Sequence, residues 1–91
     1  PEGCAGLVYA RSGLACKRGL APANKVGVVD SDYRGEINVV LHNHGSAPQT
    51  IENGERVAQL LITPVLQLAY EVAETLTDTD RNAGGFGSTG K

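Results

Sequence analysis

Apolar and polar residues along this chain of 91 residues occur in short runs separated by turn-forming residues. Over residues 36–43, Ile37, Val39 and Leu41 share one face of an extended chain, and polar side chains occupy the other face. The remaining apolar runs lie at residues 7–10, 26–29, 49–51, 56–62 and 66–72. Short runs of this kind predict β-strands, and no stretch keeps the 3.6-residue apolar period of a helix. The sequence therefore predicts an all-β sandwich or barrel without a helix.

Turn residues predict how these strands connect and where the core ends. Residues 45–48 contain Gly and Pro and predict a turn, and residues 52–55 contain an Asn-Gly pair that predicts a tight reversal. From Thr75 onward the chain consists mainly of Thr, Asp, Asn, Gly and Ser, which bury too little apolar surface to stay ordered alone. We therefore expect a β core over residues 1–74 and a flexible C-terminal arm over residues 75–91.

Composition and charge narrow the classes of partner. At 41% hydrophobic residues the chain can form only a thin core, so oligomerisation would help to cover it. Eight basic and ten acidic residues are spread along the chain, which argues against a surface for nucleic acid or membrane. Cys4 and Cys16 lack metal-ligand spacing and no secretory signal is present, so we expect free thiols and a cytoplasmic protein. The opening at Pro1 predicts a fragment or a processed chain.

Arg11, Ser12 and Gly13 are the first candidates for chemistry. They follow the first predicted strand and combine a guanidinium, a hydroxyl and an unhindered backbone, which suits phosphate oxygens. A solvated turn has the same composition, and for this tripeptide alone a turn is the favoured interpretation.

Asp30, Asp32 and Tyr33 form a second candidate group directly after an apolar run. An Asp at this point can orient a water molecule and accept its proton. The same residues can instead form a turn through their own backbone, or Asp30 and Asp32 can contribute to a metal site. Spacing alone favours the turn.

Arg56 and Gln59 are long polar side chains at the start of an apolar strand. Because an unpaired polar group is costly in such a place, each of them needs a partner. An acidic residue inside the fold would serve Arg56, and a ligand would serve Gln59.

The glycine-rich C-terminal segment is the most unusual stretch. It surrounds Phe86 with glycines, places Arg81 upstream and adds the hydroxyls of Ser88 and Thr89. Glycine backbones approach phosphates closely and an aromatic ring stacks on a base, whereas the spacing of a P-loop is absent.

Taken in order, these segments resemble the second to fifth conserved motifs of the dUTPase family. The matching stretches are residues 10–15, residues 27–35, residues 54–59 and residues 81–90. The resemblance implies a jelly-roll-like distorted β-barrel that forms a homotrimer, with each active site shared by three subunits and the arm closing over the substrate. The family's first motif, with an Asp that helps to hold hydrated Mg²⁺, is expected upstream of Pro1.

The resemblance also implies an activity, the hydrolysis of dUTP to dUMP and pyrophosphate. This reaction keeps uracil out of DNA and supplies dUMP for thymidylate synthesis. Asp30 matches the general base for attack of water at the α-phosphorus, and Tyr33 matches the residue whose ring packs against deoxyribose and disfavours a 2'-hydroxyl. Mg²⁺ is the implied cofactor and is held mainly through the substrate phosphates, and no metal ligand is assigned within the chain.

The remaining roles come from the same resemblance. Uracil would be read in a β-hairpin, largely through backbone groups, by a pocket that contains Asn24, Val28, Val29 and Asn38, with Phe86 stacked over the ring. The phosphate-contacting positions are Arg11, Ser12, Gly13, Gln59, Arg81, Ser88 and Thr89. Arg56 is assigned to a structural ion pair.

Two other functions stay open. A non-catalytic dUTPase-like module that binds nucleotide or a partner would share the fold, although the presence of Asp30, Tyr33 and Phe86 argues against it. dCTP deaminase resembles dUTPases in fold, but this chain has the glycine-rich arm and the Asp30 segment of dUTPases. Because the first motif is missing, we expect this chain alone to fold poorly and to hydrolyse dUTP weakly or not at all.

Overall fold

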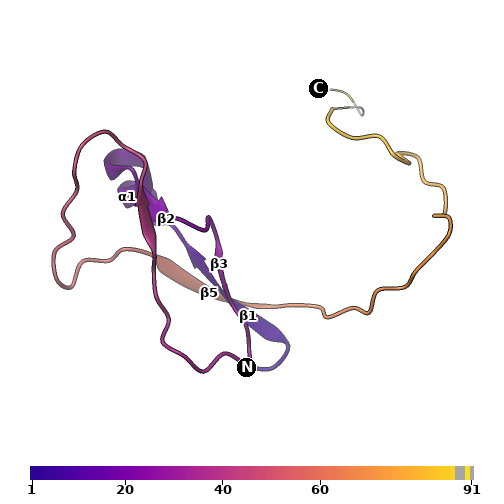
Figure 1. Cartoon of the computed structure of the whole chain (residues 1–91), viewed down its shortest axis with the longest axis horizontal. Helices are drawn as coiled ribbons and strands as arrows, with labels where there is room; N and C mark the ends of the chain where they lie inside the picture. The colour runs from indigo at the N-terminus through magenta and orange to yellow at the C-terminus, as the bar shows by residue number, and fades with distance from the viewer. Residues whose placement is uncertain (88–89, 91) are drawn as a thin grey trace.

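The computed structural model describes residues 1–87 and residue 90, and its regular elements are short. They are β1 (Cys4–Tyr9), α1 (Ser12–Arg18), β2 (Leu20–Pro22), β3 (Gly27–Val29), β4 (Leu41–Asn43) and β5 (Gln59–Pro64). One sheet has three strands in the order β3-β1-β5, and the other has two strands, β2 and β4 (Figure 1). The prediction of a mainly β chain is confirmed.

The centre of the three-stranded sheet is β1, which pairs antiparallel with both of its neighbours. β1 and β5 pair along their full lengths, from Cys4 opposite Pro64 to Tyr9 opposite Gln59. Ala5 and Val8 of this central strand are buried, as expected for a strand with a neighbour on each side. The strands predicted at residues 7–10 and 26–29 are confirmed with slightly different bounds, and the run at residues 56–62 forms the strand β5.

The helix α1 contradicts the prediction of a fold without helices. It has only seven residues, and Leu14 is its one buried side chain, so no apolar periodicity was present to predict it. Its C-terminus is nevertheless specified locally, because Lys17 and Arg18 form its last turn and Gly19 follows in the left-handed conformation, with φ 71°. The N–H of Gly19 donates to the carbonyl of Leu14 and closes the helix.

Three predicted strands are wrong or too long. The half-buried strand at residues 36–43 is reduced to β4, and residues 49–51 and 66–72 form no strand, although all of these residues are described. A strand needs a neighbouring strand to pair with, and among the described residues these runs find none beyond the single backbone bond from the N–H of Ala23 to the carbonyl of Val40. Leu66 and Tyr70, for example, are 87% and 104% exposed. The tight reversal at residues 52–55 is confirmed, since the N–H of Glu55 donates to the carbonyl of Glu52 at 3.1 Å.

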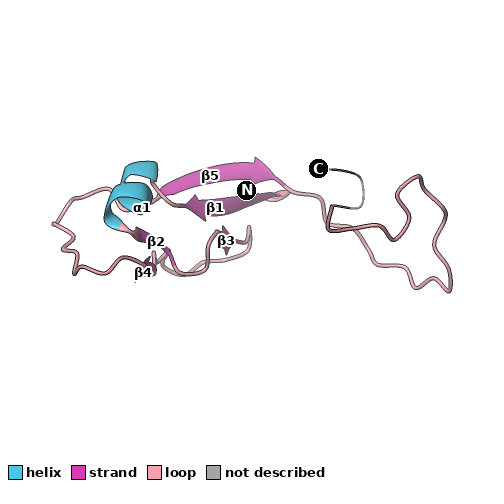
Figure 2. Cartoon of the chain, turned by 90° about the horizontal axis from the view of Figure 1, so that it is seen from above, coloured by secondary structure: helices cyan, strands magenta, loops and turns pink. Residues whose placement is uncertain are grey.

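The chain is flat and extended, as the view in Figure 2 shows. Its radius of gyration is 18.9 Å, whereas a compact domain of this length measures about 12 Å. Its accessible surface is 8071 Å², whereas a compact monomer of this mass exposes about 5,000 Å². The buried hydrophobic residues among those described are Ala5, Val8, Leu14 and Leu20. Much of the apolar surface is therefore uncovered.

Beyond β5 the chain leaves the sheets. The N–H of Val65 donates to the carbonyl of Gly3 at 2.9 Å, and this is the last backbone hydrogen bond from the described C-terminal residues to the sheets. The segment over residues 66–87 runs away from the strands and curves back beyond them (Figure 1). Cys4 and Cys16 are free thiols, which confirms that prediction. No helix of the described residues is long and apolar enough to cross a membrane.

Candidate functional site

A pocket beside β3 collects the residues that the sequence assigned to base, sugar and catalysis, except for Phe86. This strand pocket has a volume of about 270 Å³. Its lining includes Asn24, Val28, Val29, Asp30, Tyr33 and Asn38. These residues come from separate stretches of the chain, and the fold brings all of them together. Ile37 and Val39 add apolar lining and Glu36 a second acidic residue, so the pocket combines two carboxylate side chains with a mixed polar and apolar wall.

The loop after β3 fixes the Asp30 end of the strand pocket. The N–H of Tyr33 donates to the carbonyl of Asp30 at 3.1 Å, and the Tyr33 hydroxyl donates to the carbonyl of Glu36 at 2.6 Å. Arg34 Nη1 donates to the carbonyls of Ser31 and Tyr33 at 2.9 and 3.1 Å. The loop is therefore held by its own polar groups, and the carboxylate of Asp30 stays exposed to a ligand.

The Asn24 side of the strand pocket differs from the predicted hairpin. The N–H of Lys25 donates to the carbonyl of Pro22 at 3.1 Å, so a tight turn does join β2 to β3. These two strands do not pair, because β2 pairs with β4 and β3 pairs with β1. The turn therefore links two sheets. β3 is an edge strand in its sheet, which leaves one row of its backbone groups free to bind a ligand.

A second pocket lies beside the first turn of α1 and contains four of the residues assigned to the phosphates, Arg11, Ser12, Gly13 and Gln59. This helix pocket has a volume of about 400 Å³. Its lining comprises Arg11, Ser12, Gly13, Leu14, Arg18, Glu55, Arg56 and Gln59. A side chain at Gly13 would meet no atom within 4 Å, so the backbone there faces open space. Three guanidinium groups and one carboxylate give this pocket a basic character suited to an anion.

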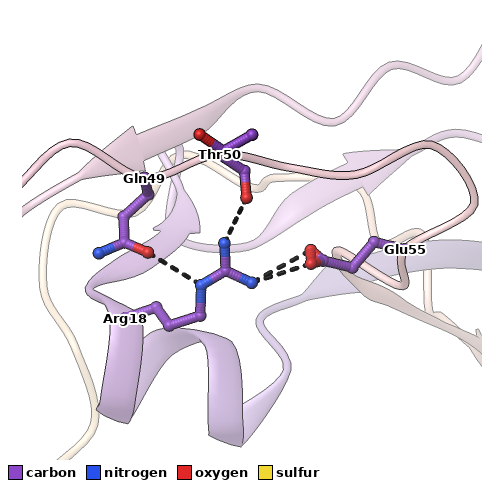
Figure 3. A network of polar contacts seen from close by, with 4 residues as sticks. All are labelled: Arg18, Gln49, Thr50 and Glu55. Carbon is purple, nitrogen blue, oxygen red and sulfur yellow. Dashed lines mark hydrogen bonds and ion pairs between the residues drawn. The ribbon is translucent and has the colours of Figure 1, made fainter.

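The ion pair next to the helix pocket belongs to Arg18 and not to Arg56. Arg18 Nη1 donates to both carboxylate oxygens of Glu55, at 2.9 and 3.1 Å, Nε donates to Gln49 Oε1 at 2.9 Å, and Nη2 donates to the carbonyl of Thr50 (Figure 3). Among the described residues this is the only salt bridge, and Arg56 is exposed. The prediction that Arg56 forms a structural ion pair is therefore wrong within the described chain, and Arg18 forms that ion pair instead.

Gln59 has a partner within the chain, although the sequence predicted a ligand. Its Nε2 donates to the carbonyl of Ala10 at 2.8 Å, which ties the start of β5 to the end of β1. The amide oxygen of Gln59 makes no hydrogen bond to another described side chain or backbone group. Because Gln59 lines the helix pocket, this oxygen remains available to accept a hydrogen bond there.

The arm residues lie apart from both pockets. Arg81 Nε donates to the carbonyl of Gly84 within the arm, at 2.6 Å, and Phe86 is fully exposed. Figure 1 shows the arm at a distance from the sheets and the helix. Ser88 and Thr89 lie outside the described residues. The described part of the chain thus holds a strand pocket and a helix pocket, whose linings share no residue, and an arm that lies apart from both.

The described residues offer no protein cage for a metal. They contain no group of three or more His, Cys, Asp or Glu side chains that could hold an ion, so Asp30 and Asp32 gain no third such ligand from the described residues. Mg²⁺ is usually bound through one or two carboxylates, water and substrate phosphates. The donor set of this chain fits an ion that arrives on phosphates.

Sequence reasoning missed two residues that shape these pockets. Arg18 and Glu55 sit 37 positions apart, and no local pattern pairs them. A partial signal was present, because two basic residues followed by Gly19 indicate the end of a helix.

Together the fold and the two pockets define a class of small β protein with one pocket of mixed polarity that bears carboxylates and a second, basic pocket. The family model for dUTPases matches residues 1–90, and the chain belongs to the dUTPase family.

Individual relatives agree with this assignment. The chain is 52% identical over 90 residues to the deoxyuridine 5'-triphosphate nucleotidohydrolase of Maricaulis maris (strain MCS10), covering 99% of this chain and 59% of that protein. It is 53% identical over 88 residues to the protein of the same name from Desulfitobacterium hafniense (strain DSM 10664 / DCB-2), covering 97% of this chain and 58% of that protein. The chain therefore spans less than two thirds of the length of these curated relatives.

Proposed function

We propose that the protein containing this chain hydrolyses dUTP to dUMP and pyrophosphate. The observation that carries the proposal is the strand pocket, where Asn24, Val28, Val29, Tyr33 and Asn38 surround the carboxylate of Asp30. Small-molecule sites combine apolar lining with a few convergent polar groups, and this pocket offers both. Membership of the dUTPase family supports dUTP as the ligand.

In the proposed mechanism, Asp30 is the general base. Its exposed carboxylate accepts a proton from water, the water oxygen forms a bond to the α-phosphorus, and the bond to the pyrophosphate oxygen breaks in line. The ring of Tyr33, held by the hydroxyl bond to Glu36, packs against deoxyribose and leaves no room for a 2'-hydroxyl. The free backbone edge of β3 reads uracil, as its edge position allows.

The helix pocket is the proposed site for the phosphates. Arg11, Ser12 and Gly13 face it from one side and Gln59 from the other. Mg²⁺, bound through the phosphates themselves, would neutralise their charge and hold their geometry. Arg56, exposed and beside this pocket, adds positive charge to it.

We further propose that three copies assemble, close a jelly-roll-like β-barrel and share each site. The two pockets are lined from different elements, and in the assembly that we propose a nucleotide contacts the strand pocket of one copy and the helix pocket of another. The core would then be residues 1–74 and the arm residues 75–91. The arm of another copy would bring Phe86 over uracil and Arg81, Ser88 and Thr89 to the terminal phosphate.

The first prediction tests the reaction and its base. With Mg²⁺ present, the complete protein that contains this chain should release pyrophosphate from dUTP and not from dCTP, dTTP or UTP. Replacement of Asp30 by Asn removes the proton acceptor while keeping the size of the side chain, so kcat should fall about a hundredfold or more. Binding of a non-hydrolysable dUTP analogue should persist in this variant.

The outcomes separate the possible functions. A folded protein that binds the analogue and releases no pyrophosphate would be a non-catalytic module. Ammonia release from dCTP would indicate a deaminase. An Asp30→Asn variant with parental kcat would show that another group accepts the proton.

A further inference from the structure

The helix pocket has two walls that come from distant parts of the chain. Arg11, Ser12 and Gly13 form one wall at the start of α1, and Glu55, Arg56 and Gln59 form the other. The second wall is approached through residues 44–58, which form no helix or strand although all of them are described. Residues 44–58 are therefore not held by regular secondary structure, and the second wall meets the sheet at Gln59, the first residue of β5.

Arg18 provides most of the polar connection between these walls. All three guanidinium nitrogens of Arg18 donate hydrogen bonds, to Gln49, Thr50 and Glu55, so one side chain holds three points of the segment (Figure 3). Gln59 adds one further connection through the carbonyl of Ala10. Within the part of the chain that the structure describes, these are the side-chain hydrogen bonds that join α1 and β1 to residues 44–59.

The bonds of Arg18 distinguish it from the other arginines of the pocket. Its forked contact with both oxygens of Glu55 neutralises its charge, and its donors are used by the protein. Arg11 and Arg56 make no side-chain hydrogen bond or salt bridge to another described residue. The pocket therefore separates its arginines into one that holds the walls and two whose donors remain for an anion.

We propose that Arg18 is a positioning residue that sets the spacing of the two walls of the helix pocket, and through it the placement of the β- and γ-phosphates of dUTP. This inference rests on the proposed dUTP hydrolysis. Arg18 acts through Glu55 and the backbone at Thr50, and it does not contact the substrate.

Loss of Arg18 has two consequences for an anion. The wall from Glu55 to Gln59 loses its main fixed point, so the geometry of the pocket becomes variable. The carboxylate of Glu55 also loses its partner and places an uncompensated negative charge beside the phosphates. Both effects oppose the binding of a triphosphate more than the binding of dUMP, which carries a single phosphate.

The test uses the complete protein that contains this chain, with Arg18→Met, Arg18→Lys, Glu55→Gln and the double variant Arg18→Met/Glu55→Gln. Lys17→Met is the matched control, because Lys17 is exposed in the same last turn of α1 and makes no side-chain hydrogen bond to a described residue. The measurements are KM and kcat for dUTP, and the affinities for dUMP and for a dUTP analogue with an imido bridge between the α- and β-phosphorus atoms.

We expect Arg18→Met to raise KM for dUTP about tenfold, with a much smaller change in kcat, and to weaken the analogue more than dUMP. Arg18→Lys keeps the positive charge but loses the three separate nitrogens of the guanidinium group. The KM of this variant for dUTP should therefore lie between those of the parent and Arg18→Met. The double variant should recover part of the loss, because the unpaired carboxylate is removed. Lys17→Met should match the parent.

Two results would overturn the inference in a parent protein that hydrolyses dUTP. One is a parental KM in Arg18→Met. The other is an equal loss of affinity for dUMP and the analogue together with a lower melting temperature, which would mean that Arg18 only stabilises the fold. A parent that binds both nucleotides but does not hydrolyse dUTP contradicts the proposed function instead, so the two failures are distinguishable.

Discussion

At the scale of the residue, the side chain of Tyr33 is controlled by its own turn. Its hydroxyl donates to the carbonyl of Glu36, three residues ahead, and the ring lies over the backbone at Gly35. A Cβ at Gly35 would lie 2.6 Å from Tyr33 Cζ and 2.9 Å from Cε1, which no real Cβ tolerates. The glycine at this position therefore keeps the ring in the place where it lines the strand pocket.

The second prediction follows from this contact. Gly35→Ala should push the Tyr33 ring out of position, because the ring is the free end of a side chain that is 48% exposed and the backbone is held by the turn. If Tyr33 excludes a 2'-hydroxyl, the preference for dUTP over UTP should fall about tenfold. Steady-state kcat/KM for the two nucleotides measures this preference.

Tyr33→Phe is the matched comparison for this prediction. It keeps the ring and loses only the bond to the carbonyl of Glu36, so the preference for dUTP should fall less than in Gly35→Ala. Parental preference in Gly35→Ala would show that the ring does not select the sugar.

At the scale of the element, the end of α1 depends on Gly19. This residue has φ 71°, and a Cβ there would lie 2.9 Å from the backbone nitrogen of Gly45. The residue before Gly45 also contacts Gly19, because the N–H of His44 donates to the carbonyl of Gly19 at 2.8 Å. The end of the helix and the chain after β4 are therefore packed too closely for any other residue.

The third prediction concerns this end of the helix. Gly19→Ala should destabilise the fold by about 1–3 kcal/mol, because it combines left-handed strain with a clash against backbone. Gly13→Ala should have the opposite sign, with a gain of about 0.5–1 kcal/mol, because Gly13 is helical and a side chain there meets open space. Urea unfolding followed by circular dichroism measures both changes, and an equal effect of the two substitutions would contradict this account.

Sequence patterns predicted elements whose partners lie within the chain. β1 and β3 were predicted from their apolar runs, and these strands pair with each other in the structure. The residues of the strand pocket were found through the family resemblance. Residues 36–40 and 66–72 have equally good alternation but no partner strand here, so periodicity alone overestimated the strands. α1 was too short for a periodic signal. The link between Arg18 and Glu55 joins residues 37 positions apart and required the fold.

At the scale of the whole molecule, the uncovered apolar surface is the main physical fact. Leu60, Leu61 and Ile62 of β5 are about half exposed, and Leu66 and Leu68 are more exposed still. An excess of about 3,000 Å² of accessible surface over a compact monomer is within the range that obligate interfaces bury. This flat chain therefore has few buried residues, and its exposed apolar surface supports assembly with further copies of the same protein.

The fourth prediction tests this assembly without a substitution. If the core of the protein is completed only between copies, unfolding is coupled to dissociation and the melting temperature must rise with protein concentration. For a trimer, each tenfold increase in concentration should raise the melting temperature by about 4 °C. Calorimetry across a hundredfold range of concentration measures the slope, and sedimentation equilibrium measures the mass of the particle that melts. A monomer with a sharp melting temperature that is independent of concentration would contradict the shared site, because one copy would then have covered its own apolar surface and would have to bind the nucleotide alone.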